Sequence, residues 1–262
     1  MVEIKGRTHI GKRQLNEDRF VADAGWGVAL VSDGMGGPAM GEVAATIVTT
    51  GMIDRLDAGE SLPDAIANTH RAVVDAAENG NGKPGMGATL VVARFDGYKF
   101  ELSWIGDSRA YLWNGELRQL TRDHSQVERM LASGKMSLTE ARESHQKNII
   151  TRAMGRDQIP AGDVPMLQGT LGRGQRLLLC SDGLTDMLSG PEIAAVLATE
   201  PDSDHALEIL VAKAVDAGGA DNITAVLATA DDSGPAPDNL PLLPAVTIAR
   251  NDGHSEYFPP GY

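Results

Sequence analysis

Cysteine, long apolar runs and basic residues are all scarce in this sequence. Cys180 is the single cysteine, which excludes an internal disulfide and is typical of proteins from a reducing cytoplasm. The chain has no run of the roughly eighteen apolar residues that a membrane-spanning helix requires. Acidic residues outnumber basic ones by 36 to 23, a formal net charge of −13, whereas nucleic-acid binding requires a basic surface. We therefore expect a cytoplasmic monomer that binds neither a membrane nor nucleic acid.

Length and composition predict a folded region followed by a tail. A chain of 262 residues, of which 42% are hydrophobic, can form one large α/β domain or two small ones. After Asp232 the composition changes to the proline-rich stretch GPAPDNLPLLP, and the chain ends in FPPGY. Such sequence has too little apolar periodicity to bury a core. We expect a folded domain over residues 1–232 and an extended, disordered tail over residues 233–262.

The first third of the chain shows both strand and helix patterns. The apolar run Val28–Ser32 is a predicted buried strand, and it follows a short predicted strand near residues 4–10. Two helical patterns come next. One starts at about Gly41, and the other covers SLPDAIANTHRAVVDAAE with Ser61 as its N-cap and a proline in its first turn.

The rest of the chain adds further strands and helices. Residues 87–121 alternate with period two, and the pairs Asp96-Gly97 and Asn114-Gly115 are hairpin signals. The apolar runs RLLLCSDG and NITAVLAT are predicted strands with two helices between them, the first opened by the capping pair Ser189 and Glu192. Hairpins require antiparallel neighbours, so we predict an α+β sandwich with helices outside two antiparallel sheets. A parallel doubly wound sheet fits less well.

Several aspartates stand at the ends of the predicted strands. Asp33 lies in VSDGMGG, Asp182 in CSDGLTD and Asp221 in GGADNIT, each beside an apolar run. A glycine follows Asp33 and Asp182, which would let the backbone approach a bound ion closely. Asp107 repeats the pattern in IGDSRAY. The other acidic residues that could join this group are Glu17, Asp18 and Asp186.

Two interpretations fit these acidic residues. Taken singly, each is well explained as a turn or cap residue, because aspartate is common in both. As a set they favour a metal site, since carboxylates drawn together repel one another unless cations neutralise them. All-oxygen ligands, in a chain without cysteine pairs and with few histidines, favour Mg²⁺ or Mn²⁺ over Zn²⁺.

Phosphoryl transfer is a natural use of two such ions. They would lower the pKa of a bridging water and hold the oxygens of an in-line displacement. Arg13, close before Glu17, is a candidate to bind the phosphate with its forked guanidinium. The alternative for Arg13 is an ordinary surface arginine, which composition alone favours.

An ordered series of short motifs runs along the chain. The motifs are RQLNED from Arg13, DGMGG from Asp33, GAT from Gly87, GDSR from Gly106, DHS from Asp123, TRAMG from Thr151, SDG from Ser181 and DN from Asp221. Each motif alone is weak. The ordered set, over roughly residues 5–229, resembles the metal-dependent protein phosphatase family, type 2C, in its short bacterial form.

This resemblance implies a fold, an activity and partners. The fold would be a four-layer α-β-β-α sandwich of two antiparallel sheets flanked by helix pairs, so that residues 1–232 form a catalytic domain. The activity would be hydrolysis of phosphoserine and phosphothreonine in proteins, with two Mn²⁺ or Mg²⁺ ions per active site and room for a third. The implied partners are phosphorylated proteins, either a serine/threonine kinase or the substrates of one.

The resemblance also implies roles for individual residues. Asp33 would bridge two metal ions, the Gly34 carbonyl would bind one of them, and Arg13 would bind the substrate phosphate. The other implied metal ligands are Asp182 and Asp221 on the second ion, Glu17 and Asp18 through metal-bound waters, and Asp107 and Asp186 with Asp182 around a third ion.

One position departs from the family pattern. Many bacterial members have histidine after the DGMGG motif, but this chain has Pro38, which cannot donate a proton. Another group must then protonate the leaving alkoxide. His145 is one candidate, in a segment of about residues 125–150 that resembles the family's flap, and metal-bound water is the other. His145 fits an exposed flap residue equally well.

Other function classes remain as alternatives. Residues 34–39 resemble the GxGxxA fingerprint of a dinucleotide-binding oxidoreductase, although the meander does not belong in a Rossmann half. A cysteine-dependent phosphatase needs Cys-x5-Arg, and the residue at that spacing from Cys180 is Asp186. A phosphoprotein-binding pseudophosphatase would have lost metal ligands, and none of the predicted ligands is missing.

Overall fold

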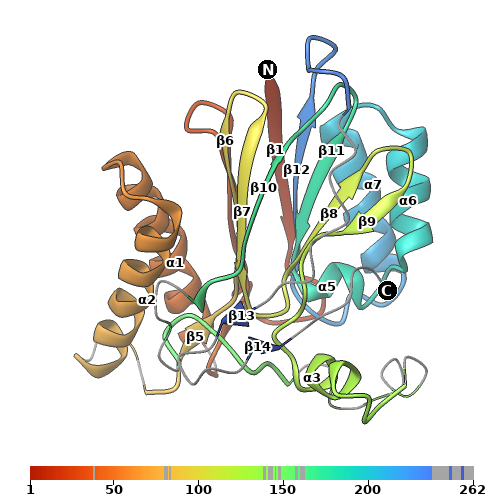
Figure 1. Ribbon diagram of the computed structural model, residues 1–262. Helices are drawn as coiled ribbons and strands as arrows, with labels where there is room; N and C mark the ends of the chain where they lie inside the picture. Colours follow the sequence, from red (N-terminus) through yellow and green to blue (C-terminus); the bar gives the residue numbers. More distant parts are fainter. Residues whose placement is uncertain are drawn as a thin grey trace.

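The structure is a computed structural model that describes residues 1–37, 39–79, 82, 84–137, 140, 144, 146, 149–156, 159, 163–237, 248–249 and 255–256. Within these residues, two five-stranded sheets pack face to face, and helices cover their outer faces (Figure 1). The arrangement confirms the predicted α+β class and the four-layer α-β-β-α sandwich.

The first sheet contains the N-terminal strand next to the last strand of the sandwich. Its strand order is β1 (Val2–His9), β12 (Ile223–Ala230), β11 (Arg176–Cys180), β8 (Arg109–Trp113) and β9 (Leu117–Gln119). All of these pairings are antiparallel. The short α5 (Asp182–Thr185) and the longer α6 (Gly190–Thr199) and α7 (Ser203–Asp216) lie on its outer side (Figure 1).

The second sheet is built mainly from the meander and the strands before it. Its strand order is β10 (Met166–Thr170), β7 (Lys99–Ile105), β6 (Leu90–Asp96), β3 (Val28–Ser32) and β2 (Arg19–Asp23), again all antiparallel. Helices α1 (Met40–Asp57) and α2 (Leu62–Glu78) cover its outer face (Figure 1). The smaller elements are β4 (Gly34–Met35) paired with β5 (Gly87–Ala88), α3 (Gln126–Ala132), and β13 (Ile248–Ala249) paired with β14 (Ser255–Glu256).

Each central strand is buried on both faces, because one face meets the other sheet and the opposite face meets helices. On β11, Leu177 and Leu179 pack between the sheets, whereas Leu178 and Cys180 pack against the α6–α7 layer. Strands buried in this way appear in the sequence as continuous apolar runs. That is why RLLLC and the run Val28–Ser32 could be recognised as strands.

Local signals in the sequence correspond to observed hydrogen bonds. Ser61 caps α2, since its side chain accepts from the Asp64 N–H, and Ser189 with Glu192 forms the capping box of α6. Gly97 and Gly115 have φ angles of 59° and 99° in the two hairpin turns, where glycine avoids the strain of a positive φ. These predictions are confirmed.

The chain after the last sandwich strand is described only in part. Arg173 N–H donates to the Pro235 carbonyl at 2.8 Å, so the first residues beyond Asp232 contact the turn between β10 and β11. Most of the predicted tail lies outside the described residues. The boundary at residue 232 therefore stays a prediction. No helix in the described part of the chain combines the length and apolar character needed to cross a membrane.

Candidate metal centre

Acidic residues from both sheets meet at one end of the sandwich, near β5 and α5 in Figure 1. Asp33 directly follows β3, and Asp107 lies in the turn between β7 and β8. On the side of the first sheet, Asp182 follows β11 as the first residue of α5, and Asp221 precedes β12. Residues far apart in the sequence are thus placed at one site by the ends of rigid strands.

These residues line one open cleft with a volume of about 510 Å³. Asp18 is 2% exposed, and its Oδ2 accepts a hydrogen bond from Ser181 Oγ at 2.8 Å. Asp186 follows α5, and its charge acts on Asp182. The predicted site residues that line the cleft itself are Arg13, Glu17, Asp33, Gly34, Asp107, Asp182 and Asp221.

Burial and mutual repulsion raise the pKa values of the carboxyl groups here. For Asp33, burial raises the pKa well above its usual range, and the other aspartates of the cluster raise it further. Burial raises the pKa of Asp107 to about 8, with Asp182 and Asp123 adding to the effect. The pKa of Asp182 rises to about 6 through burial and the charge of Asp186. A bound cation would reverse these shifts and let the group ionise.

The donor atoms fit a hard divalent cation. Asp18 Oδ1 and Asp182 Oδ1 are buried, and neither has a hydrogen-bond partner among the described residues. Unpaired buried oxygens of this kind are costly without a ligand. Within the described residues, no three acidic, histidine or cysteine side chains enclose an ion by themselves. Each ion would therefore keep waters and add a backbone carbonyl, as Mg²⁺ and Mn²⁺ do at oxygen-rich sites.

The glycines after Asp33 and Asp182 also make room for a second backbone segment. A Cβ atom on Gly34 would lie 2.0 Å from the Gly41 carbonyl oxygen in α1, and one on Gly183 would lie 1.9 Å from the Asn222 carbonyl oxygen. Both glycines therefore allow two backbone segments to cross at the cleft. The Gly183 contact brings the Asp221 loop against the start of α5. The predicted approach of these glycines to an ion stays a prediction.

The loop between β1 and β2 carries Arg13 and Glu17. Arg13 Nη2 donates a hydrogen bond of 2.7 Å to Asp221 Oδ2, and the arginine side chain is 58% exposed. Glu17 Oε1 accepts from the Gly41 N–H at 3.1 Å, in the first turn of α1, where the helix dipole favours a negative charge. Arg13 thus brings a positive charge to the cleft that Asp33, Asp107, Asp182 and Asp221 line, which we call the carboxylate cleft.

Sequence reasoning gave no role to two polar residues that hold these loops. Asn222 Oδ1 accepts from the Glu17 N–H at 2.8 Å, and its Nδ2 donates to the carbonyls of Ile10 and Leu15. Thr89 Oγ1 accepts from the Asp33 N–H at 2.9 Å. Both residues belong to the sequence motifs. For Asn222 the available signal was its position next to Asp221, whereas for Thr89 it was membership of the GAT motif alone.

The flap side of the cleft is described in part. Ser125 caps α3 and pairs with Ile150, which lines the cleft. Burial lowers the pKa of His124 to about 4, with the charge of Arg152 as a second cause. His145 and Pro38, on which the prediction about the leaving group depends, both lie outside the described residues.

A larger cleft, of about 720 Å³, lies elsewhere on the second sheet. It is lined by residues of the β2–β3 turn and of strands β6, β7 and β10, among them Trp26, Arg94, Glu101 and Gln168. Arg94 and Glu101 are opposite each other in the register of β6 and β7, and each has a polar partner, since Arg94 Nη1 donates to the Glu60 carbonyl and Glu101 Oε1 accepts from Gln168 Nε2. We place the functional site in the smaller cleft because the clustered aspartates lie there and not in the larger one.

Known proteins are similar to this chain in both sequence and fold. A sequence profile described as Protein phosphatase 2C matches residues 5–214. The serine/threonine phosphatase stp of Listeria welshimeri is 34% identical over 239 residues, which cover 84% of this chain and 93% of that protein.

Two crystal structures show the same likeness in three dimensions. The Mycobacterium tuberculosis serine/threonine phosphatase PstP/Ppp has a TM-score of 0.79 and 31% identity, and the match covers 88% of this chain and 99% of that one. The catalytic domain of PstP in complex with 2 manganese ions has a TM-score of 0.77 at 31% identity, with the same shares covered. The profile spans most of the sequence and the relatives align over nearly all of the sandwich, so this chain belongs to the protein phosphatase 2C family.

Proposed function

We propose that the carboxylate cleft hydrolyses phosphoserine and phosphothreonine in proteins with the help of bound divalent cations. The observation that supports this most is the meeting of four aspartates with Arg13 in one open cleft. Relatives that cover most of the chain are serine/threonine phosphatases. The chain is thus a metal-dependent serine/threonine protein phosphatase, and its substrates are phosphorylated proteins.

The cations would be two Mn²⁺ or Mg²⁺ ions. Asp33 would bridge them, the Gly34 carbonyl would bind one, and Asp182 with Asp221 would bind the other. Supporting this assignment, Asp33 is the carboxyl on which all the other aspartates of the cluster act. When bound, such ions supply Lewis acidity and an acidified water for in-line attack on phosphorus.

The remaining acidic residues would act around this pair. Glu17 and Asp18 would hold waters of the ions, and the unpartnered Asp18 Oδ1 is suited to this. Asp107 and Asp186 would join Asp182 around a third ion. In support, Asp107 and Asp182 repel each other, and Asp186 adds to the repulsion on Asp182.

Arg13 would bind the phosphate of the substrate. Its guanidinium is exposed at the cleft and is held by Asp221 Oδ2. With Asp221 turned to a cation, the fork of Arg13 is free to donate two hydrogen bonds to phosphate oxygens. Charge-assisted pairing of this kind both orients the phosphate and offsets its charge. The leaving alkoxide would take its proton from His145 or from a water bound to the metal.

The alternatives are not favoured. The segment after Asp33 enters the short β4, which pairs antiparallel with β5, and not a parallel strand-helix-strand unit as a dinucleotide site requires. All predicted metal ligands are present, contrary to what a pseudophosphatase would show. We further propose a cytoplasmic monomer that opposes a serine/threonine kinase, with residues 1–232 as the catalytic domain. Light scattering that finds a stable dimer would contradict the monomer.

The test uses metal removal. The purified protein should hydrolyse p-nitrophenyl phosphate and a phosphothreonine peptide in Mn²⁺ or Mg²⁺, and EDTA should stop both reactions. Readdition of Mn²⁺ after EDTA should restore them, which controls for irreversible loss of the fold. Undiminished hydrolysis by the metal-free protein would rule the proposal out.

A further inference from the structure

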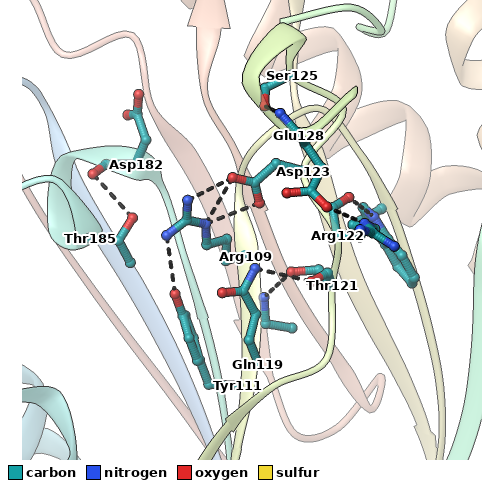
Figure 2. Close-up of polar contacts among 12 residues, drawn as sticks. Arg109, Tyr111, Gln119, Thr121, Arg122, Asp123, Ser125, Glu128, Asp182 and Thr185 are labelled. Carbon is teal, nitrogen blue, oxygen red and sulfur yellow. Dashed lines mark hydrogen bonds and ion pairs between the residues drawn. The ribbon is translucent and has the colours of Figure 1, made fainter. Parts of the chain in front are cut away.

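The turn that carries Asp107 is attached on both sides to the same short segment, and Figure 2 shows the attachment through Arg109 and Asp123. Arg109, at the start of β8, donates from Nε to Asp123 Oδ1 at 3.0 Å and from Nη2 to Asp123 Oδ2 at 2.6 Å. Before Asp107, the Gly106 N–H donates to His124 Nδ1 at 3.1 Å, and the Gly106 carbonyl accepts from the His124 N–H at 2.8 Å. Asp107 therefore lies between Gly106 and Arg109, which are attached to His124 and Asp123 respectively.

This segment, residues 121–125, forms the root of the flap and is hydrogen-bonded to both sheets. Thr121 Oγ1 accepts from the Ala110 N–H at 3.1 Å, and the Thr121 carbonyl accepts from Gln119 Nε2 at 3.0 Å (Figure 2). The Arg122 carbonyl accepts from Trp104 Nε1 at 2.7 Å. A flap root held at so many points can transmit a constraint to the Asp107 turn.

The flap root also reaches the opposite stem of the flap. The His124 carbonyl accepts from the Thr151 N–H at 2.6 Å, and the Gln126 N–H donates to the Ile149 carbonyl at 2.9 Å. Ile150, which pairs with Ser125, lines the cleft. One continuous set of contacts thus joins Arg109, the flap root and the cleft wall.

The Arg109–Asp123 ion pair has a fixed geometry. The two side chains are 32% and 13% exposed, and the two-pronged contact fixes the orientation of both. Arg109 Nη1 also lies 3.4 Å from Tyr111 Oη, which further restricts the guanidinium.

We propose that Arg109 is a positioning residue that, clamped by Asp123, fixes the Asp107 turn to the flap root and so couples the flap to cation binding at Asp107 and Asp182. This inference rests on the proposed function, because it takes Asp107 as a metal ligand. Cation binding at Asp107 holds the flap root, residues 121–125, in place, and release of this segment from Arg109 weakens the binding of that cation. The position of the flap root and the affinity for the cation at Asp107 then depend on each other.

The test compares Mn²⁺ binding in four variants of the full chain. Calorimetric titration should show the weakest Mn²⁺ step loosened by about tenfold in Arg109→Gln and Asp123→Asn, as for other residues that orient metal ligands. Arg109→Lys keeps the charge but not the fork, so it should resemble Arg109→Gln. The matched control is Glu128→Gln, which breaks the Arg122–Glu128 ion pair at the same flap root, where both side chains are 24% exposed. Its Mn²⁺ binding should stay as in the wild type.

Hydrogen–deuterium exchange supplies a second readout that does not depend on activity. Mn²⁺ should slow amide exchange over residues 121–126 and 149–151 in the wild type and in Glu128→Gln, but much less in Arg109→Gln. An unchanged Mn²⁺ titration in folded Arg109→Gln would overturn the inference. If that variant does not fold, Arg109→Lys and Asp123→Asn decide in the same way. A wild type that binds no Mn²⁺ would instead contradict the proposed function itself.

Discussion

The two walls of the carboxylate cleft are held in place by different means. On one wall, Asp33 and Asp182 follow β3 and β11, strands in which every residue is buried. On the other wall, the flap is attached through polar contacts of Asp123 and His124, and its short helix α3 buries only Val127 among its residues. Core packing fixes the first wall, whereas an ion pair and hydrogen bonds attach the described part of the second, and polar contacts of this kind separate at lower cost than a buried core. We therefore assign phosphate hydrolysis to the wall that carries Asp33 and Asp182, and adjustment of the cleft to the flap wall.

The largest effect is expected on the rigid wall. Asp33→Asn should lower the Mn²⁺-dependent turnover of p-nitrophenyl phosphate by about a hundredfold or more, because in the proposed site this one carboxylate would bind both ions. The matched control is Asp231→Asn, which removes a carboxylate bound to the N-terminal amino group and Tyr98, away from the cleft. Turnover by Asp33→Asn within a few-fold of the control would contradict the bridging role.

The flap wall is tested through the leaving group. A serine alkoxide needs a proton, whereas p-nitrophenolate leaves well without one. If His145 gives that proton, His145→Ala should slow phosphopeptide hydrolysis at least about tenfold more than p-nitrophenyl phosphate hydrolysis. Pro38→His should then rescue the alanine variant. Equal slowing of both substrates would remove His145 from the mechanism and leave the metal assignment untouched.

Arg13 tests whether the cleft binds phosphate from the solvent side. Arg13→Ala should raise the KM for a phosphopeptide about tenfold with little change in kcat, since the lost contact is a charge-assisted hydrogen bond. Arg7→Ala is the control, because Arg7 is also an exposed arginine in an ion pair, with Glu208. Equal KM values in the two variants would show that Arg13 is an ordinary surface arginine.

His124 tests how firmly the flap root is packed. Its pKa is lowered to about 4 from 6.5, so the folded protein holds it neutral where the unfolded chain binds a proton. Its contribution to stability is full above pH 6.5 and is lost as the pH falls from 6.5 toward 4. The loss is at most about 3 kcal/mol, and less where solvent reaches the ring.

His124→Asn keeps an acceptor for the Gly106 N–H and removes the titration. Urea unfolding in EDTA at pH 7.5 and pH 4.5 should therefore show a smaller loss of unfolding free energy in the variant than in the wild type. The comparison between the two proteins cancels the contribution of the cleft carboxyls. The same pH dependence in both would mean that the flap root opens freely.

The smallest effect is expected far from both walls, at the tail. A chain ending at Asp232 loses the hydrogen bond from Arg173 to Pro235, worth about 1 kcal/mol, so its Tm should fall by about 2–4 °C. A chain ending at Pro237 should melt like the full chain, and both should keep full p-nitrophenyl phosphate activity. A fall of many degrees in either would show that the tail packs on the domain.

Predictions from the sequence succeeded where the physical cause is local. Ser61 and Ser189 cap helices through hydrogen bonds to residues three positions on, and the Asp96-Gly97 turn depends on the backbone freedom of one glycine. The buried strands were visible because both of their faces need apolar side chains. Such features depend on nearest neighbours in the chain and can be read from it.

Contacts between distant segments were beyond the sequence. Nothing near Asn222 indicates that its side chain binds the carbonyls of Ile10 and Leu15, and nothing near Gly183 indicates a crossing with the Asn222 backbone. The sequence predicted that the glycines after Asp33 and Asp182 leave space for an ion, and it gave no sign that they also make room for another backbone segment. Such contacts depend on how the two sheets are placed against each other.

The sequence by itself determined the strands, the caps, the family resemblance and the acidic residues at strand ends. Only the tertiary structure decided that Asp33, Asp107, Asp182 and Asp221 share one cleft, and that Arg13 pairs with one of them while Arg109 pairs with Asp123. The reason is physical. Backbone propensity and apolar periodicity act over a few residues, whereas charge and hydrogen bonding act through space, between groups that come close only when both sheets and their helices have packed.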